Sequence, residues 1–147
     1  MSFFDALSIS ASGLTAQRLR MDVISENLAN VNTTRAEGGK PYQRKIALFQ
    51  EKGQNLPFSA YFSEALGNPG AGKGVRVSRV VNDETPGAKV YEPSHPDADA
   101  DGYVTMPNVN MVTEMVNMIS ASRSYEANVT AINISKAIMA KTLEISR

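Results

Sequence analysis

The chain has 147 residues, in which 15 lysines and arginines balance 15 aspartates and glutamates, with one histidine and no cysteine or tryptophan. Zero formal charge argues against nucleic acid as a partner, because that function needs a basic surface. The lack of cysteine excludes disulfides, thiolate catalysis and zinc–thiolate sites, and a single histidine excludes a multi-histidine metal site. Composition therefore disfavours most enzyme classes.

Residues 2 to about 32 contain no proline and a single glycine, Gly13. Apolar residues recur there every seven positions, with a second set beside them: Leu7, Leu14, Met21 and Leu28, then Phe4, Ala11, Ile24 and Val31. Residues at this spacing share one face of a helix, so the pattern predicts a long amphipathic N-terminal helix. Asn30, Asn32, Thr33 and Thr34 favour turns and predict its end.

The middle of the chain, about residues 35 to 108, holds all seven prolines and nine of the ten glycines. Short runs of β-branched and aromatic residues predict strands at 42–49, 75–81, 89–91 and 103–106. The turn sequence Thr85-Pro86-Gly87 predicts a hairpin between the second and third of these strands. The glycine-rich residues 67–74 predict a mobile surface loop.

After Pro107 a helical pattern returns and continues through the last residues. Steps of four and three define an a/d seam: Met111, Met115, Met118, Ser122, Tyr125, Val129, Ile132, Lys136, Met139 and Leu143. A second stripe widens the apolar face: Ala131, Ile134, Ile138 and Ile145. We expect the seam to pack against the N-terminal helix, and the outer stripes to contact other subunits.

Helices of roughly 45 and 55 Å do not fit a compact globule of this length, which would be only about 38 Å across. The predicted fold is therefore α+β and elongated. Residues 1–34 and 109–147 pair as a coiled-coil-like core domain, and residues 35–108 form a small β-rich, irregular middle. No apolar run reaches the ~20 residues of a transmembrane helix, and the N-terminus lacks the features of a cleaved signal peptide.

Two motifs imitate ligand sites. Gly67-x4-Gly72-Lys73 follows a phosphate-binding loop, but Gly74 stands where Ser or Thr must hold Mg²⁺. The order of the neighbouring predicted elements also differs from that motif, so a surface loop is favoured over a nucleotide-binding enzyme.

Asp97, Asp99, Asp101 and Gly102 imitate the start of a calcium loop, but Asn108 occupies the position of the bidentate glutamate. We expect an exposed acidic turn there and leave a weak cation site open. His95 is favoured as a structural or solvent-facing residue. Scattered basic residues are expected on solvated faces or at contacts between subunits: Arg18, Arg20, Arg44, Lys45 and Arg123. The sequence thus predicts no catalytic residue, cofactor or metal.

Residues 12–19 and 26–34, SGLTAQRL and ENLANVNTT, resemble the N-terminal signature of bacterial flagellar rod and hook proteins. Three further stretches are similar to proximal rod proteins of that family: residues 41–44, 95–110 and 114–128. The motif residues that carry the resemblance are Ala29, Asn30, Thr33, Pro41, Tyr42, Gly102, Tyr103, Pro107 and Asn108.

The resemblance implies a structural subunit that stacks helically around a channel in the proximal rod and transmits torque. Its implied partners are itself, other rod subunits and the flagellar type III export apparatus, with export into the periplasmic space without signal cleavage. Another axial rod subunit of similar size and a soluble coiled-coil adaptor remain the alternatives. Replacing Leu28 or Ile132 with Asp is expected to abolish assembly.

Overall fold

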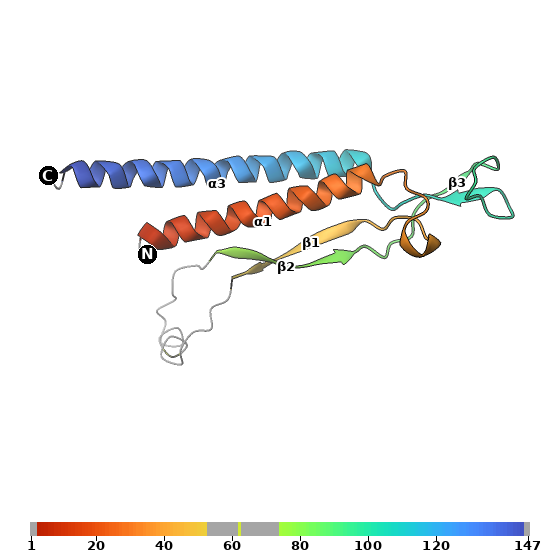
Figure 1. The fold of residues 1–147 in the computed structure, drawn as a ribbon, viewed down its shortest axis with the longest axis horizontal. Coiled ribbons are helices and arrows are strands. Elements are labelled where there is room, and N and C mark those ends of the chain that lie inside the picture. Colours follow the sequence, from red (N-terminus) through yellow and green to blue (C-terminus); the bar gives the residue numbers. More distant parts are fainter. Residues whose placement is uncertain (1–2, 53–61, 63–73, 146–147) are drawn as a thin grey trace.

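The computed structural model describes residues 3–52, 62 and 74–145 (Figure 1). The glycine-rich loop predicted at 67–74 lies outside these residues except for Gly74. The phosphate-loop candidates Gly67, Gly72 and Lys73 lie outside them as well.

Two long helices dominate the molecule. Helix α1 covers Phe3–Ala29 and α3 covers Met111–Ile145, with 27 and 35 residues respectively. At 1.5 Å per residue they are about 40 and 52 Å long. They run antiparallel and side by side, with small β-ribbons beside and beyond them (Figure 1). The predicted elongated α+β fold is confirmed.

The end of α1 is made by the turn-forming residues that follow it. The Asn30 side chain donates to the Glu26 carbonyl at 2.9 Å, and the Thr33 hydroxyl donates to Asn30 Oδ1 at 3.1 Å. These side-chain bonds add to the backbone bonds of the last turn, where the Asn30 N–H still donates to the Glu26 carbonyl at 3.2 Å. The chain then passes through a short 3₁₀ turn, η1 (Glu37–Gly39), before entering the first strand.

The four strands pair differently from our prediction. Strand β1 (Lys45–Glu51) pairs antiparallel with β2 (Val75–Asn82), and β3 (Lys89–Tyr91) pairs antiparallel with β4 (Tyr103–Thr105). The β1–β2 ribbon packs against α1, whereas β3 and β4 lie past the end of the helix pair (Figure 1).

The predicted hairpin between residues 75–81 and 89–91 is therefore wrong. Asp83 Oδ1 accepts the Thr85 N–H at 3.1 Å and its hydroxyl at 2.6 Å, which fixes the chain locally just after β2. These bonds do not fold the chain back onto β2. The Ala88 carbonyl instead accepts the Met106 N–H at 2.8 Å, which directs this segment to the partner strand at 103–105.

The two helices bury small and polar residues as well as the apolar Val23 and Ile24 of α1. Buried positions include Gly13 and Ala16 on α1, and Glu114 and Ala121 on α3. A Cβ atom added to Gly13 would lie 2.9 Å from Asn128 Oδ1, so the Asn128 side chain packs directly against the Gly13 backbone. Such an approach favours the smallest side chain.

The predicted apolar seam on α3 is therefore wrong at both of its ends. Met111, Met115, Met139 and Leu143 are exposed instead of packed on α1. The face that contacts α1 contains Glu114, which immediately precedes Met115 in the chain. The apolar heptad pattern located the helix correctly, but it did not include the small residues at the contact between α1 and α3.

Candidate assembly interface

A buried carboxylate joins the helices at the end where the strands begin. Glu114 on α3 is 1% exposed, and its Oε1 accepts Arg44 Nε at 2.9 Å and Arg44 Nη2 at 2.8 Å. Its Oε2 accepts Asn27 Nδ2 of α1 at 3.0 Å. The bidentate guanidinium and the amide together satisfy a charge that burial alone would strongly disfavour.

Asn27, also 1% exposed, connects α1 to the first strand. Its Oδ1 accepts the Lys45 N–H at 2.8 Å and the Tyr42 hydroxyl at 2.9 Å, and its Nδ2 donates to the Lys45 carbonyl at 2.9 Å. Burial, followed by the nearby carboxylates of Glu26 and Glu114, raises the pKa of Tyr42 from 10.0 to about 12. Tyr42 therefore stays a neutral donor. We call Asn27, Tyr42, Arg44 and Glu114 the polar network.

Asn108 extends the polar network to the segment that enters α3. Its Oδ1 accepts the Arg44 N–H at 2.7 Å, and its Nδ2 donates to the Asp83 carbonyl at 2.9 Å. Asp83 also forms an ion pair with Arg44 at 3.6 Å. Hydrogen bonds from Thr85, followed by the Arg44 charge, lower the pKa of the Asp83 carboxyl. The preceding Pro107 is buried.

The other motif residues shape the turns around this network. The Tyr42 N–H donates to the Thr33 carbonyl at 3.1 Å, so the end of α1 is held against the start of β1. Pro41 is half-buried just before it, and Ala29 is exposed at the last position of α1. The family motif therefore describes a structural joint between α1 and the ribbon.

The acidic turn uses its carboxylates for local structure. Asp99 Oδ1 accepts the N–H groups of Asp101 and Tyr103 at 3.0 and 2.8 Å, and Gly102 adopts the left-handed φ of 80° that this turn requires. The Tyr103 ring meets Tyr91 edge to face at 5.3 Å. Among the described residues, no group of three possible ligands is arranged to hold a metal ion.

The neighbouring residues of this turn are also engaged within the chain. Asp97 accepts the Thr34 hydroxyl at 2.8 Å and pairs with Arg35 at 3.5 Å. The His95 Nδ1 accepts the Asp97 N–H at 3.1 Å. Each of these contacts holds the turn in place.

The predicted interface residues divide into two groups in the structure. Those half-buried or buried within the helix pair and its joint are Leu7, Leu14, Met21, Ile24, Leu28, Val31, Met118, Tyr125, Val129 and Ile132. Those left exposed are Phe4, Met111, Met115, Ile138, Met139, Leu143 and Ile145. Contact of the second group with other subunits stays a prediction.

Two features of this region were not predicted from the sequence. Val112, Val116 and Ile119 form, with Met115, an exposed apolar patch on the first turns of α3. These residues lie off the a/d positions of the predicted seam, so the heptad pattern did not include them. Arg44 was predicted to lie on a solvated face or at a contact between subunits, whereas its guanidinium is bound to the buried Glu114. The sequence feature that could have indicated this contact is the opposite charge of Arg44 and Glu114.

Comparison with known proteins identifies the class. A family profile described as "Flagella basal body rod protein" matches residues 7–36, and one described as "Flagellar basal body rod FlgEFG protein C-terminal" matches residues 100–145. None of the helices among the described residues has the length and apolar character needed to cross a membrane.

Relatives align along the whole chain. A flagellar basal-body rod protein FlgC of Bacillus subtilis is 49% identical over 151 residues, covering 100% of both chains. The FlgC of Borreliella burgdorferi is 46% identical over 99% of this chain and 98% of its own, and that of Aquifex aeolicus is 42% identical over 98% and 97%.

The paired terminal helices and these matches define a structural, non-enzymatic subunit of the bacterial flagellar basal-body rod. More particularly, the chain belongs to the FlgC family of flagellar basal-body rod proteins. Its assembly with rod subunits follows from that membership.

Proposed function

We propose that this chain forms part of the proximal rod, where copies of it and other rod subunits assemble helically through their terminal helices. The assembled tube transmits torque and surrounds the export channel. The observation that carries this proposal is the set of exposed apolar side chains along α3: Met111, Val112, Met115, Val116, Ile119, Ile134, Ile138, Met139, Leu143 and Ile145. Exposed apolar area on this scale marks an interaction surface.

In this proposal, residues 1–34 and 109–147 make the assembly contacts, and residues 35–108 form an accessory middle region. The polar network supports it, because it fixes β1 to both helices at one end while most of α3 stays accessible. Contacts between unlike surfaces that do not close on themselves produce an open helical assembly. The exposed methionines suit contacts that are not identical from subunit to subunit, since Met packs adaptably.

The chain is further proposed to leave the cytoplasm through the flagellar type III export apparatus and to reach the periplasmic space without signal cleavage. An unfolded chain suits such a route. The exposed stripes of α3 are then covered only when neighbouring subunits arrive, so part of the folding free energy is gained on assembly.

The test is to place a charge on exposed apolar positions. Ile119→Asp and Ile138→Asp are expected to disturb the helix pair little, because both side chains are more than half exposed. Each is expected to abolish motility and to remove the chain from isolated basal bodies. Leu28→Asp and Ile132→Asp are weaker tests, because both residues are half-buried and a charge there also disturbs the helix pair.

Thr130→Asp is the matched control on an exposed polar position of the same helix. It is expected to leave motility and rod content unchanged. Normal rods in the isoleucine variants would refute assembly through α3. A purified chain that forms a stable small oligomer without rod partners would favour the coiled-coil adaptor instead.

A further inference from the structure

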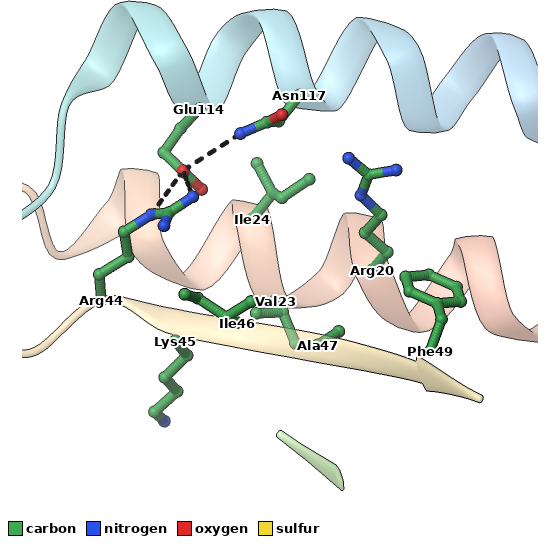
Figure 2. A pocket seen from close by; sticks show the side chains of 10 residues that line it. All are labelled: Arg20, Val23, Ile24, Arg44, Lys45, Ile46, Ala47, Phe49, Glu114 and Asn117. Carbon is green, nitrogen blue, oxygen red and sulfur yellow. Dashed lines mark hydrogen bonds and ion pairs between the residues drawn. The ribbon is translucent and has the colours of Figure 1, made fainter. Parts of the chain in front are cut away.

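A groove of about 300 Å³ opens between α1, β1 and α3 (Figure 2). Its apolar residues come from the helix α1 and the strand β1: Val23, Ile24, Ile46, Ala47 and Phe49. The Phe49 ring is 39% exposed at the end of the groove, and Arg20 and Asn117 supply polar groups to its sides. It therefore combines an apolar floor with hydrogen-bond donors.

The charges in the groove do not cancel. Arg44 is held by Glu114, and the Lys45 side chain points away from both and pairs with Glu26 (Figure 2). The Arg20 side chain extends from α1 toward α3, and no carboxylate within the described part of the chain pairs with it. Arg20 thus leaves one positive charge in the groove without a partner, beside apolar surface.

The distal end of α3 has the complementary chemistry. Asn27 contacts Glu114 and Gly13 contacts Asn128, which defines the antiparallel register of α1 and α3. In the same register, Phe3 lies level with about residue 138. Residues 138–145, which we call the α3 overhang, extend roughly 10 Å past the first residue of α1. No described residue of α1 covers them, and Leu143 is 63% exposed.

One side of the α3 overhang is apolar with an acid at its border. Met139, Ala140 and Leu143 share a helical face that continues the side of α3 facing α1, and Glu144 lies next to it. Glu144 accepts Lys141 Nζ at 2.7 Å, but both side chains are largely exposed, so this ion pair contributes little and does not oppose a new partner. A guanidinium can bind the same carboxylate with two hydrogen bonds.

We propose that the α3 overhang of a second copy of this chain docks in the groove, with Met139 and Leu143 on its apolar floor and Glu144 paired with Arg20. The inference rests on the proposed assembly and names one contact within it. The groove lies near the opposite end of the helix pair from the overhang, so a copy cannot fill its own groove. The contact is therefore heterologous and propagates as an open chain of subunits.

Cross-linking tests the pairing directly, because the natural chain has no cysteine. We expect a chain carrying both Phe49→Cys and Leu143→Cys, assembled in cells, to give dimers and higher multimers when isolated basal bodies are treated with a short bifunctional maleimide. Val90→Cys combined with Leu143→Cys is the control, since Val90 is exposed on β3, does not line the groove and is not among the exposed apolar residues of α3. It is expected to give no multimers.

Charge reversal tests the ion pair. Arg20→Glu in the cross-linking background is expected to reduce the multimer yield about fivefold to tenfold, and adding Glu144→Arg is expected to restore it. Arg18→Glu, at an exposed position outside the groove, is expected to change nothing.

The two hypotheses fail in different ways. A chain missing from isolated rods refutes the proposed function. A chain present in rods without a link between positions 49 and 143 refutes only this contact. Equal linking through position 90 refutes the specificity of this contact, and a product with the mass of a different rod protein overturns the second-copy assignment.

Discussion

The two ends of the helix pair differ in the kind of interaction they use. At the end near Ala29 and Met111, Glu114 is bound by Arg44 and Asn27, and β1 is hydrogen-bonded to the same asparagine. At the other end α3 continues past α1 with exposed Met139, Leu143 and Ile145, the last 86% exposed. Directional polar contacts fix one end, and non-directional apolar surface remains at the other.

This difference separates folding from assembly along one helix. Hydrogen bonds to a buried charge have strict geometry, so the polar network selects a single register for the two helices. Apolar side chains such as Met139 and Leu143 accept several packing arrangements, which suits contact with non-identical neighbours. The first end fixes the register of the helix pair, and the second presents the apolar surface through which we propose that subunits assemble.

Removing the buried carboxylate should have the largest effect on stability. Glu114→Ala leaves the Arg44 guanidinium without its main partner, and we expect the free energy of unfolding to fall by about 3–5 kcal/mol. Urea unfolding followed by circular dichroism measures it. Glu126→Ala, at an exposed position of the same helix, is the control and should have no measurable effect. Equal losses in both variants would show that the polar network has no special role.

Disturbing the contact between Gly13 and Asn128 is expected to have the next largest effect on stability. Gly13→Val places methyl groups where Asn128 lies within 3 Å of even a Cβ atom, so we expect a loss of about 1–3 kcal/mol. The loss should shrink when Asn128→Ala is added, because the clash is then relieved. Thermal unfolding of the two single variants and the double variant gives the coupling. Additive losses would contradict close packing at this pair.

Alkaline pH should weaken the polar network through Tyr42. Its pKa of about 12 in the folded chain exceeds the ordinary value of 10.0, so folding favours the protonated phenol. The stabilisation is complete below pH 10 and is lost as pH rises from 10 toward 12, by on the order of 1–2 kcal/mol. Urea unfolding across this range measures it. Tyr42→Phe should show a smaller decline, and an identical decline would exclude Tyr42 as its source.

The smallest effect on stability is expected at the α3 overhang. Leu143→Ser removes an exposed side chain with no partner among the described residues, so the free energy of unfolding of the isolated chain should change by less than about 0.5 kcal/mol. The same substitution should impair rod assembly, measured by the chain content of isolated basal bodies. A large loss of stability in the isolated chain would mean that the two ends are not distinct.

Much of the fold could be predicted from local patterns. The positions of α1, α3 and the four strands follow from helical periodicity, β-branched runs and the confinement of proline and glycine to the middle. Strand pairing could not be predicted, because β1 and β2 are joined through more than twenty intervening residues and no local turn specifies that they meet. The Thr85-Pro86-Gly87 turn suggested the wrong partner.

The polar network was missed for a related reason. Asn27, Arg44 and Glu114 are ordinary surface residue types when each is considered alone. Their function as a joint depends on three segments meeting, which one-dimensional spacing does not reveal. The apolar stripes, in contrast, were visible in the sequence because periodicity is local, although the structure exposes part of the predicted seam.

The antiparallel pairing of α1 with α3 has a consequence for the order of events during folding. Helix α1 finds its main partner, α3, more than eighty residues further along the chain, so its main contacts have a long sequence separation. Contacts of such long sequence separation form late and slowly, and an isolated α1 gains little by folding first. Until α3 is present, α1 lacks its main packing partner. This delay preserves the unfolded state that the proposed export route requires.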